Sequence, residues 1–442
     1  MRIAVINWSR RKVGGTETYL CDVIPGLAQL GHSVALWHEI DRPHNREPIE
    51  LPPGVPSWCV EKLGAKGALE ALRDWEPDLI YAHSLLTPKL EAETLRIAPA
   101  VFFAHAYYGT CISGAKTFKT PDMRPCGRRF GLKCLAHYYP RRCGGLSPLT
   151  MLRLYRLQSQ RLKLLSEYRA VLTHSLHMHD EYVRHGLPPE RVHYLSYSAH
   201  GSAAQYSEAP EELFQSEQLS EGATRAVEIE KEKPYAHLLF AGRMETLKGG
   251  HLFVESLREV RDGLSSPLRV TFAGDGPERK RWERLASKVT GRADGIEIEF
   301  RGWLRREEME DLYRECDLLV FPSVWPEPFG LAGPEAGLHG IPVAAFNVGG
   351  VPEWLIDGVN GYLAPGDPPT ARGLARAIIK CLRDDETHRS LRRGAVKTAR
   401  QFSLDIHLNS LTKVFDRIAG GGASRPAVGV AAVGREAARE AL

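Results

Sequence analysis

The sequence predicts an α/β protein made of two doubly wound domains, each built on a parallel sheet, that face each other across a cleft. Its 442 residues exceed what one ordinary core accommodates. In both halves, short apolar runs alternate with helical patterns, which indicates parallel strands with helices on both faces. Residues 201–233 are polar and acidic and interrupt this alternation, so we expect a linker or surface insertion there.

The first half, residues 1–200, opens with the buried strand "RIAVINW" and a turn at Gly14 and Gly15. Thr16 is placed to cap a helix whose apolar residues recur at helical spacing until Gly31. A long helix is expected from about residue 149 to 167. The other expected strands are "HSVALWH", "PDLIYAHS", "PAVFFAH", "RAVLTHS" and "VHYLSYS".

The alternation restarts in residues 234–401. We expect a C-terminal helix, residues 402–418, to complete the first domain, and the Gly/Ala-rich residues 419–442 to form a flexible tail. The expected strands are "AHLLFAG", "LRVTFAG", "IEIEFRGWL", "DLLVFPS" and "IPVAAFN". The expected helices are "GHLFVESLREVRDGL", "RKRWERLASKV", "REEMEDLYREC" and one that opens at "LAGPEAGLHG".

Composition narrows the class of protein. With 43% hydrophobic and 25% charged residues the chain is typical of soluble globular proteins. A net charge of +4 is too small to indicate a nucleic-acid partner, and none is expected. No apolar run approaches the roughly 20 residues that span a bilayer, and the charged "SRRK" follows the first apolar run too closely for a signal peptide. The expected location is therefore cytoplasmic, with peripheral contact to the inner face of the cell membrane as an option.

The segment "EPFGLAGPEA" carries two carboxylates, Glu327 and Glu335, on either side of a glycine loop. Gly330 lets the backbone N–H groups of Phe329, Gly330 and Leu331 approach a ligand closely, ahead of a helix N-terminus that favours a phosphate. Glu335 can then accept hydrogen bonds from ribose hydroxyls, while Glu327 addresses the other end of the same ligand. The two acids are predicted to position a ligand rather than to act as an acid and base pair.

Two cations follow the strand "AHLLFAG". Arg243 and Lys248 lie five residues apart on the loop that leaves it. A planar guanidinium and a flexible ammonium can converge on a diphosphate, although a solvated, positively charged loop explains the same spacing.

Other polar groups follow strands in the first half. Gly14 and Gly15 form a glycine turn that can contact a phosphate or a sugar. His83 and His105 each end a predicted strand. Structural hydrogen bonding and a role in a ligand site both remain open for these histidines.

Together, the ordered motifs "GRMETLKGG", "FAGDGPE", "FRGWL", "EPFGLAGPEA" and "NVGGVPEWLIDGVNGYLAPGD" resemble those of the family-4 retaining glycosyltransferases, which have the two-domain GT-B fold. The resemblance covers roughly residues 1–200 and 234–418. It implies transfer of a sugar from a nucleotide-diphosphate-sugar to an acceptor hydroxyl, in polysaccharide, glycolipid or other glycoconjugate biosynthesis. The donor base (uridine, guanosine or adenosine), the sugar and the acceptor are not specified by the motifs.

The resemblance also implies roles for individual residues. Arg243 and Lys248 hold the diphosphate, Glu335 binds the ribose, and Glu327 contacts the donor sugar. His105 lies beside that sugar and supports catalysis, with His83 as second choice. The backbone amides of the 329–331 loop and Gly15, with Gly14 as second choice, complete the donor contacts.

The resemblance suggests front-face substitution in which the leaving phosphate helps to deprotonate the acceptor. No Asp-x-Asp follows a strand, so we expect transfer without a metal ion or cofactor. Two alternatives stay open: a nucleotide-sugar epimerase of the same fold, and a non-catalytic nucleotide-sugar-binding protein.

Residues 109–146 form an insertion rich in cysteine and in basic residues that the resemblance does not explain. Cys111, Cys126, Cys134 and Cys143 lack the tight Cys-x2-Cys pairs of most zinc sites. A structural zinc site, a disulfide and reduced thiols that pack the loop all remain open.

The basic region 116–163 contains twelve Lys and Arg side chains and one acid, Asp122. Such a region is either a solvated surface or a contact for an anionic partner, which would be a lipid-diphosphate acceptor or an anionic membrane.

Overall fold

The computed structural model describes residues 1–196, 235–290 and 295–420. The predicted linker at 201–233 and most of the predicted tail lie outside these residues. The described chain forms two compact units. The first contains residues 1–120, 126–196 and 403–420, and the second contains residues 121–125, 235–290 and 295–402.

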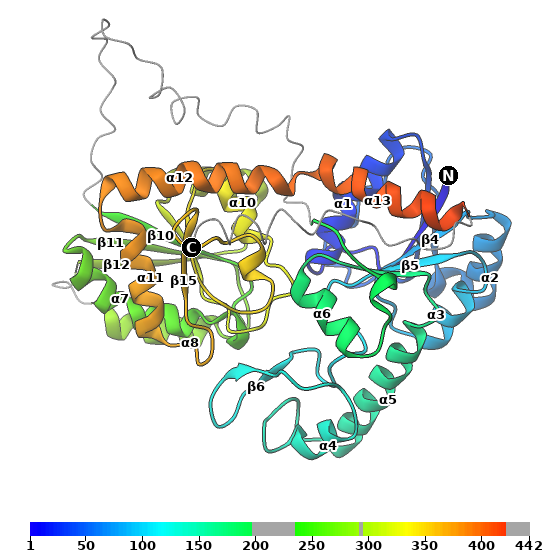
Figure 1. Ribbon diagram of the computed structural model, residues 1–442, viewed down its shortest axis with the longest axis horizontal. Coiled ribbons are helices and arrows are strands. Elements are labelled where there is room, and N and C mark those ends of the chain that lie inside the picture. Colours follow the sequence, from blue (N-terminus) through cyan, green and yellow to red (C-terminus); the bar gives the residue numbers. More distant parts are fainter. Residues whose placement is uncertain (197–234, 291–294, 421–442) are drawn as a thin grey trace, which may run out of the picture. The chain divides into compact units, whose positions relative to one another are not determined.

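The first unit is built on a seven-stranded sheet with the order β3-β2-β1-β4-β5-β8-β9 (Figure 1). Every pairing within it is parallel. The chain steps from β1 to β2 and β3 on one side and then crosses to β4 on the other. In such sheets ligands bind at the carboxyl ends of the strands, where this reversal occurs.

The elements of this unit alternate as the sequence predicts. In chain order they are β1 (Arg2–Ser9), α1 (Gly15–Gln29), β2 (Ser33–Ile40), β3 (Ser57–Cys59), α2 (Val60–Asp74), β4 (Leu79–Ala82), α3 (Pro88–Thr94), β5 (Ala100–Phe103), β6 (Thr117–Phe118), α4 (Lys133–Tyr138), α5 (Pro148–Leu164), β8 (Ala170–Thr173), α6 (Leu176–Arg184), η1 (Pro189–Arg191), β9 (Val192–Tyr194) and α13 (Leu404–Ala419). A two-residue strand, β7 (Arg124–Pro125), interrupts the series.

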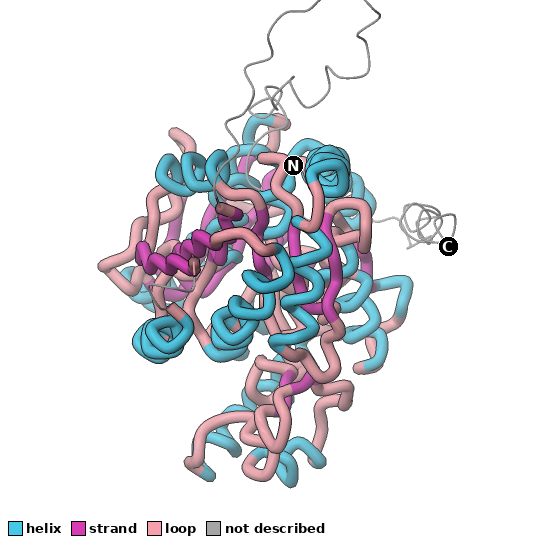
Figure 2. The backbone as a smooth tube through the Cα atoms, turned by 90° about the vertical axis from the view of Figure 1, so that its left-hand side faces the viewer, coloured by secondary structure: helices cyan, strands magenta, loops and turns pink. Residues whose placement is uncertain are grey.

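The insertion between β5 and β8 lies away from the seven-stranded sheet in both views, and Figure 2 shows that most of it is loop. It is anchored by a buried lysine. Lys116 is 3% exposed and donates hydrogen bonds to the backbone oxygens of Thr110 and Arg128, at 3.4 and 2.7 Å, and to Glu181 of α6. The prediction that Lys116 belongs to a basic surface is therefore wrong.

The second unit is built on a six-stranded parallel sheet with the order β12-β11-β10-β13-β14-β15. Its strand order reverses between β10 and β13. In chain order the elements are β10 (Ala236–Ala241), η5 (Thr246–Lys248), α7 (Gly250–Leu264), β11 (Leu268–Ala273), α8 (Arg279–Val289), β12 (Ile296–Gly302), α9 (Arg306–Glu315), β13 (Leu318–Phe321), α10 (Ala332–Leu338), β14 (Val343–Phe346), η6 (Val351–Glu353), β15 (Gly361–Ala364), α11 (Ala371–Leu382), α12 (Asp385–Ala399) and η7 (Arg400–Phe402). The two parallel sheets confirm the predicted α/β fold class.

The structure differs from the sequence predictions at several elements. Helix α1 is capped through Glu17, whose carboxylate accepts from the Gly14 N–H at 2.9 Å, and not through Thr16. Strands β3, β6, β7 and β15 and helices α2, α3, α4, α6, α11 and α12 were not individually predicted. Helix α13 begins at Leu404, because the Ser403 hydroxyl accepts from the Ile406 N–H at 3.4 Å as its N-cap.

Candidate functional site

Polar side chains of the second unit gather where β10 and β13 end, at the reversal of its strand order. The loop after β10 carries Arg243 and Lys248, and the loop after β13 carries Glu327. The two loops are joined by backbone bonds, since the Leu247 carbonyl accepts from the N–H groups of Val324 and Trp325 at 2.9 and 3.2 Å. This packing brings groups that lie about eighty residues apart in the sequence to one sheet edge.

Lys248 and Glu327 form the centre of this edge. The Lys248 ammonium lies 2.6 Å from Glu327 Oε1, and the Ser323 hydroxyl donates to the same oxygen at 2.6 Å. The Glu327 side chain is 4% exposed and that of Lys248 is 24% exposed. Within the described part of the chain, Oε2 of Glu327 accepts no hydrogen bond. The pair therefore keeps an acceptor oxygen and a partly exposed cation for a ligand.

The aromatic rings around Lys248 restrict where its ammonium can lie. The nitrogen is 5.3 Å from the ring centre of Trp325 and 5.9 Å from that of Phe321. Ring faces attract cations within about this distance. The two rings hold the Lys248 ammonium at the sheet edge, and this attraction does not occupy its N–H groups.

Arg243, the second cation of this edge, is paired with a neighbouring acid. Its guanidinium lies 2.6 Å from Glu245, and the two side chains are 56% and 38% exposed. Exposed ion pairs of this kind contribute about 0–1 kcal/mol, so an anionic ligand can exchange with Glu245 at little cost.

The glycine loop after β13 is shaped by Gly330 and held by one indole hydrogen bond. Gly330 has φ of +97°, a conformation that favours glycine. The carbonyl of Phe329 accepts from the Trp354 indole at 2.7 Å, which fixes the loop. Among the described residues, the N–H groups of Gly330 and Leu331 donate no backbone hydrogen bond.

Helix α10 after this loop is only seven residues long, so the loop amides, more than a helix dipole, suit a phosphate. Glu335 lies in the first turn and a half of α10 and is partly exposed.

A supporting loop that sequence reasoning left without a role holds Glu327 in place. The N–H of Gly350 donates to the Glu327 carbonyl at 2.6 Å. Gly349 has φ of +58°, and a Cβ there would lie 2.3 Å from that carbonyl oxygen and 2.4 Å from the Glu327 nitrogen. Glycine at position 349 is thus required, because the two backbones lie too close for a side chain. The adjacent glycines of "NVGG" were the signal in the sequence for such a close approach.

In the first unit, histidines follow three adjacent strands. His83, His105 and His174 come directly after or one residue beyond the ends of β4, β5 and β8. His83 Nδ1 and His105 Nε2 are 2.8 Å apart, so one ring donates to the other. His174 was missed, although "LTHS" repeats the pattern of "YAHS" that marked His83.

A fourth histidine comes from the C-terminal helix. His407 of α13 is fully buried, and its Nε2 lies 2.7 Å from the Tyr19 hydroxyl, which is itself 2.6 Å from the Tyr81 hydroxyl. His407 Nδ1 lies 2.6 Å from the Ser196 carbonyl. The spacing of the sequence could not indicate this contact, because it joins residues 388 positions apart.

Burial keeps these histidines neutral. It lowers the pKa of His83 and of His174 to about 3, and that of His407 to about 4. The pKa of His105 is held well below its usual range, first by burial and then by the neighbouring histidines. At neutral pH these rings therefore act as hydrogen-bonding groups and not as cations.

The glycine turn of the first unit is open. A Cβ on Gly15 would meet nothing within 4 Å, and one on Gly14 would meet only the Glu17 carboxylate at 3.8 Å. The fold thus does not require glycine at position 15, which leaves room for a ligand beside the start of α1.

The four cysteines of the insertion are free thiols. Within the described residues, no three His, Cys, Asp or Glu side chains form a group that could hold a metal ion. No disulfide joins these cysteines, and their role stays a prediction. Of the other four cysteines, Cys59, Cys316 and Cys381 are buried and Cys21 is partly exposed.

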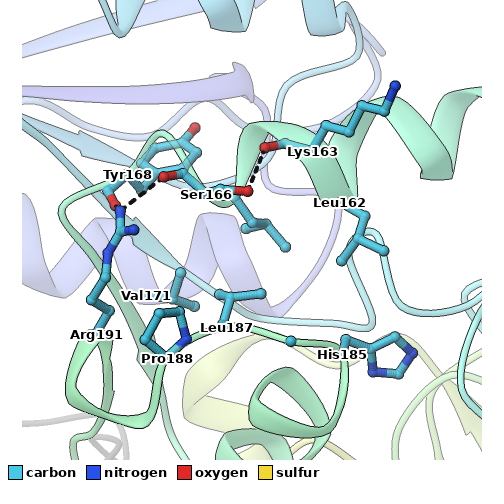
Figure 3. Close-up of a pocket in the computed structure, with 11 residues that line it drawn as sticks. Leu162, Lys163, Ser166, Tyr168, Val171, His185, Leu187, Pro188 and Arg191 are labelled. Atoms are coloured by element: carbon cyan, nitrogen blue, oxygen red, sulfur yellow. Dashed lines mark hydrogen bonds between the residues drawn. The ribbon is translucent and has the colours of Figure 1, made fainter.

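A cavity of about 220 Å³ lies at the opposite edge of the first sheet, among the loops that precede β8 and β9 (Figure 3). Its polar groups are occupied by the protein itself. Arg191 donates to the carbonyls of Ser166 and Tyr168, and His185 is bonded through both ring nitrogens, to Glu181 and Phe130. Figure 3 shows the Lys163 ammonium directed away from the other lining residues. These contacts stabilise the loops, and we assign no ligand to this cavity.

Comparison with known proteins extends over most of the chain. Residues 13–196 match the model of "Glycosyltransferase Family 4", and residues 223–398 match that of "Glycosyl transferases group 1". D-inositol 3-phosphate glycosyltransferase 1 of Catenulispora acidiphila is 31% identical over 195 residues, 43% of this chain and 46% of that protein. A D-inositol 3-phosphate glycosyltransferase of Streptomyces bingchenggensis is 35% identical over 176 residues, 38% of this chain and 37% of that protein. The chain thus spans less than half the length of these relatives.

Solved structures share the fold over nearly the whole chain. HepE of Anabaena in complex with UDP and glucose aligns with a TM-score of 0.62 at 19% identity, covering 94% of this chain and 99% of HepE. Sucrose-phosphate synthase of Thermosynechococcus elongatus aligns with a TM-score of 0.66 at 17% identity, covering 95% and 100%. At these identities the likeness concerns the fold.

Proposed function

We propose that this chain, which belongs to the family-4 glycosyltransferases, transfers a sugar from a nucleotide-diphosphate-sugar to an acceptor hydroxyl. The observation that carries the proposal is the Lys248–Glu327 pair at the strand-order reversal of the second sheet. Ligands of doubly wound sheets bind at this position, and the pair offers a cation and an acceptor oxygen side by side.

The donor diphosphate is assigned to the cations and open amides of this edge. Lys248 and Arg243 balance the charge that develops on the leaving phosphate, and the Gly330 and Leu331 amides donate to its oxygens. Phe329 contributes through the same loop. Glu335 of α10 accepts from the ribose hydroxyls, and Glu327 accepts from a hydroxyl of the donor sugar.

The first unit contributes the remaining roles that the family implies. Gly15, with Gly14 as second choice, leaves space for the phosphate or the sugar. His105 lies beside the donor sugar as a neutral hydrogen-bonding group. His83, a second choice as a direct contact, acts by holding the His105 ring through the 2.8 Å bond.

The transfer is proposed to retain the anomeric configuration and to need no metal ion, because the cations already balance the phosphate charge. Activity should therefore persist in excess EDTA. A loss that added Mg²⁺ or Mn²⁺ restores would contradict this part of the proposal.

The donor base is best found by a thermal-shift screen of UDP, GDP and ADP and of their sugars. A ligand that binds only the native state raises the unfolding midpoint. UDP and UDP-glucose come first in the panel, because HepE structures contain them. Inositol 3-phosphate is the first acceptor to test, because it appears in the names of the relatives.

The activity test is release of the nucleoside diphosphate. We expect release only when donor and acceptor are both present, and about 100-fold or greater loss in Glu327→Gln. Release from the donor alone would indicate the epimerase alternative. Donor binding with no turnover across the acceptor panel would indicate a binding protein.

We also propose that the basic region 116–163, without Lys116, faces an anionic partner. The region's exposed cations support this. They are Lys119, Arg124, Arg129, Lys133, Arg142, Arg153, Arg156 and Lys163. In the described part of the chain no helix is long and apolar enough to cross a membrane, so contact with lipid would be peripheral.

A further inference from the structure

The insertion exposes large apolar side chains next to its cations. Leu132, Leu146 and Leu149 are 75%, 83% and 80% exposed, and Leu152 is 41% exposed. Every other exposed large hydrophobic residue of the described chain is at most 52% exposed. Single exposed leucines are ordinary on protein surfaces, but a group of the most exposed ones marks an interaction site.

These leucines share a helix face with arginines. In α5, Leu149, Leu152, Arg153 and Arg156 follow one another at i, i+3, i+4 and i+7, and all four are exposed. Residues at these spacings lie on one side of a helix. The opposite side packs on the protein. Gln158 on that side is buried, and its side-chain oxygen accepts from the Gly109 N–H at 2.9 Å.

The start of α4 joins the same surface. The rings of Phe130 and Tyr155 are 5.2 Å apart, which places the loop before α4 against the middle of α5. Leu132 and Lys133 follow directly, and both are exposed. We call this surface the insertion tip. It comprises Leu132, Lys133, Leu146, Leu149, Leu152, Arg153 and Arg156.

The positive charge of residues 126–163 indicates an anionic partner. Between residues 126 and 163 the sequence has no Asp or Glu. A second copy of this chain would place cations against cations, so the tip is a poor surface for self-association. Leucines flanked by arginines match the boundary of an anionic bilayer, where apolar side chains enter the acyl region and guanidinium groups reach the lipid phosphates.

We infer that the insertion tip docks the protein on an anionic lipid bilayer by shallow insertion of its leucines. The inference rests on the proposed anionic partner of region 116–163 and names it. It specifies that leucine insertion and charge both contribute, whereas a purely electrostatic contact would need only the cations. It is independent of the proposed donor contacts, because no residue of the insertion tip is among them.

The test is flotation with vesicles of phosphatidylcholine and phosphatidylglycerol, and with phosphatidylcholine alone, at low and high salt. We expect the wild type to float with the anionic vesicles. Leu146→Ser/Leu149→Ser should lower the partition coefficient about tenfold, and Arg153→Gln/Arg156→Gln about tenfold. Leu63→Ser, which alters a half-exposed leucine of α2, is the matched control and should float as the wild type does.

A second readout reports insertion itself. The emission of Leu149→Trp, read as a difference spectrum against the wild type, should shift to the blue with anionic vesicles and be quenched by lipids brominated on their acyl chains. The inference is overturned if the wild type does not float at low salt. It is also overturned if the leucine variant floats like the wild type, or if light scattering shows a dimer that this variant converts to a monomer. Thermal shifts with nucleoside diphosphates, measured on the same variants, test the donor site separately.

Discussion

Two lysine–glutamate pairs, one in each unit, show how differently the same two residue types can be used. Lys116 and Glu181 of the first unit have side chains that are 4% and 0% exposed. Lys116 donates to three oxygens, and Glu181 also binds Arg184 and lies 3.5 Å from His185. Lys248 of the second unit is 24% exposed and donates to one carboxylate oxygen of Glu327.

The two lysines differ in how many of their N–H groups the protein already binds. Lys116 has as many oxygen partners as N–H groups, so its pair fixes the insertion to α6. Burial lowers its pKa to about 8, which is the cost of placing an ammonium inside the protein. Lys248 keeps donors and exposure at a sheet edge where ligands bind. Both pairs are therefore expected to support stability, because both carboxylates are buried, and only the second to govern activity.

Removal of the open pair should have the largest effect on catalysis. Lys248→Met should reduce transfer by about 100- to 1000-fold, since it deletes a donor to the leaving phosphate. The unfolding midpoint should fall as well, because the Glu327 side chain is 4% exposed and keeps only its bond from Ser323, so turnover is compared per folded molecule. Rates of nucleoside diphosphate release and a thermal melt measure the two effects.

Lys280→Met, on an exposed position of α8, is the control and should retain wild-type rates. Transfer by Lys248→Met at the wild-type rate would remove this pair from the active site.

Removal of Lys116 from its pair with Glu181 should reduce stability without reducing activity. Lys116→Met leaves Glu181 buried with one partner fewer, and breaking such a pair costs about 3 kcal/mol. We expect a lower unfolding free energy of the first unit and faster hydrogen exchange in α6 and the insertion. Turnover per folded molecule should be preserved at low temperature. Lys119→Met alters a neighbouring exposed lysine and serves as the control; equal melts for the two variants would contradict the structural role.

Titration should report on the buried histidines of the first unit. His83, His174 and His407 are buried and have pKa values near 3 to 4, below the usual value near 6.5. The unfolded chain takes up protons on these residues before the folded chain does, so their contribution is present above pH 6.5 and is lost as pH falls toward 4. Each adds a slope of about 1.4 kcal/mol per pH unit.

Denaturant melts of wild type and His407→Gln across this range test the slope. The variant removes one titrating group while its amide can still bond to Tyr19, so its stability should depend less steeply on pH. Identical slopes would show that His407 is already accessible to protons in the folded state.

Two glycines give the smallest and most discriminating contrast. A Cβ on Gly333 of α10 would lie 2.1 to 2.7 Å from the Trp354 ring, so Gly333→Ala should cost about 1–3 kcal/mol by overpacking. Gly15→Ala has open space and should leave stability unchanged, yet raise the KM for the donor. If Gly15→Ala leaves both stability and KM unchanged, Gly15 does not contact the donor.

Much of this architecture could be predicted from the sequence, because alternating apolar runs and helical patterns are local signals. The loops after β10 and β13 could be placed at strand ends for the same reason. The pairing of Lys248 with Glu327 could not, since it depends on how two loops pack. The pairing of Arg243 with Glu245 is local to one loop and was missed. His407 and the burial of Lys116 were missed because each depends on a contact between segments distant in sequence. The exposure of Leu146 and Leu149 was missed because helical periodicity alone does not say which face is covered.

The most direct test of the central claim is calorimetric titration of UDP, GDP and ADP into the wild type, Lys248→Met and Lys116→Met. We predict that one nucleoside diphosphate binds the wild type. Lys248→Met should weaken that binding by about tenfold or more, because a charge-assisted contact is lost, while folded Lys116→Met should bind as the wild type does. Equal affinity in wild type and Lys248→Met, or no binding of any nucleoside diphosphate, would contradict the assignment of the second unit's sheet edge as the donor site.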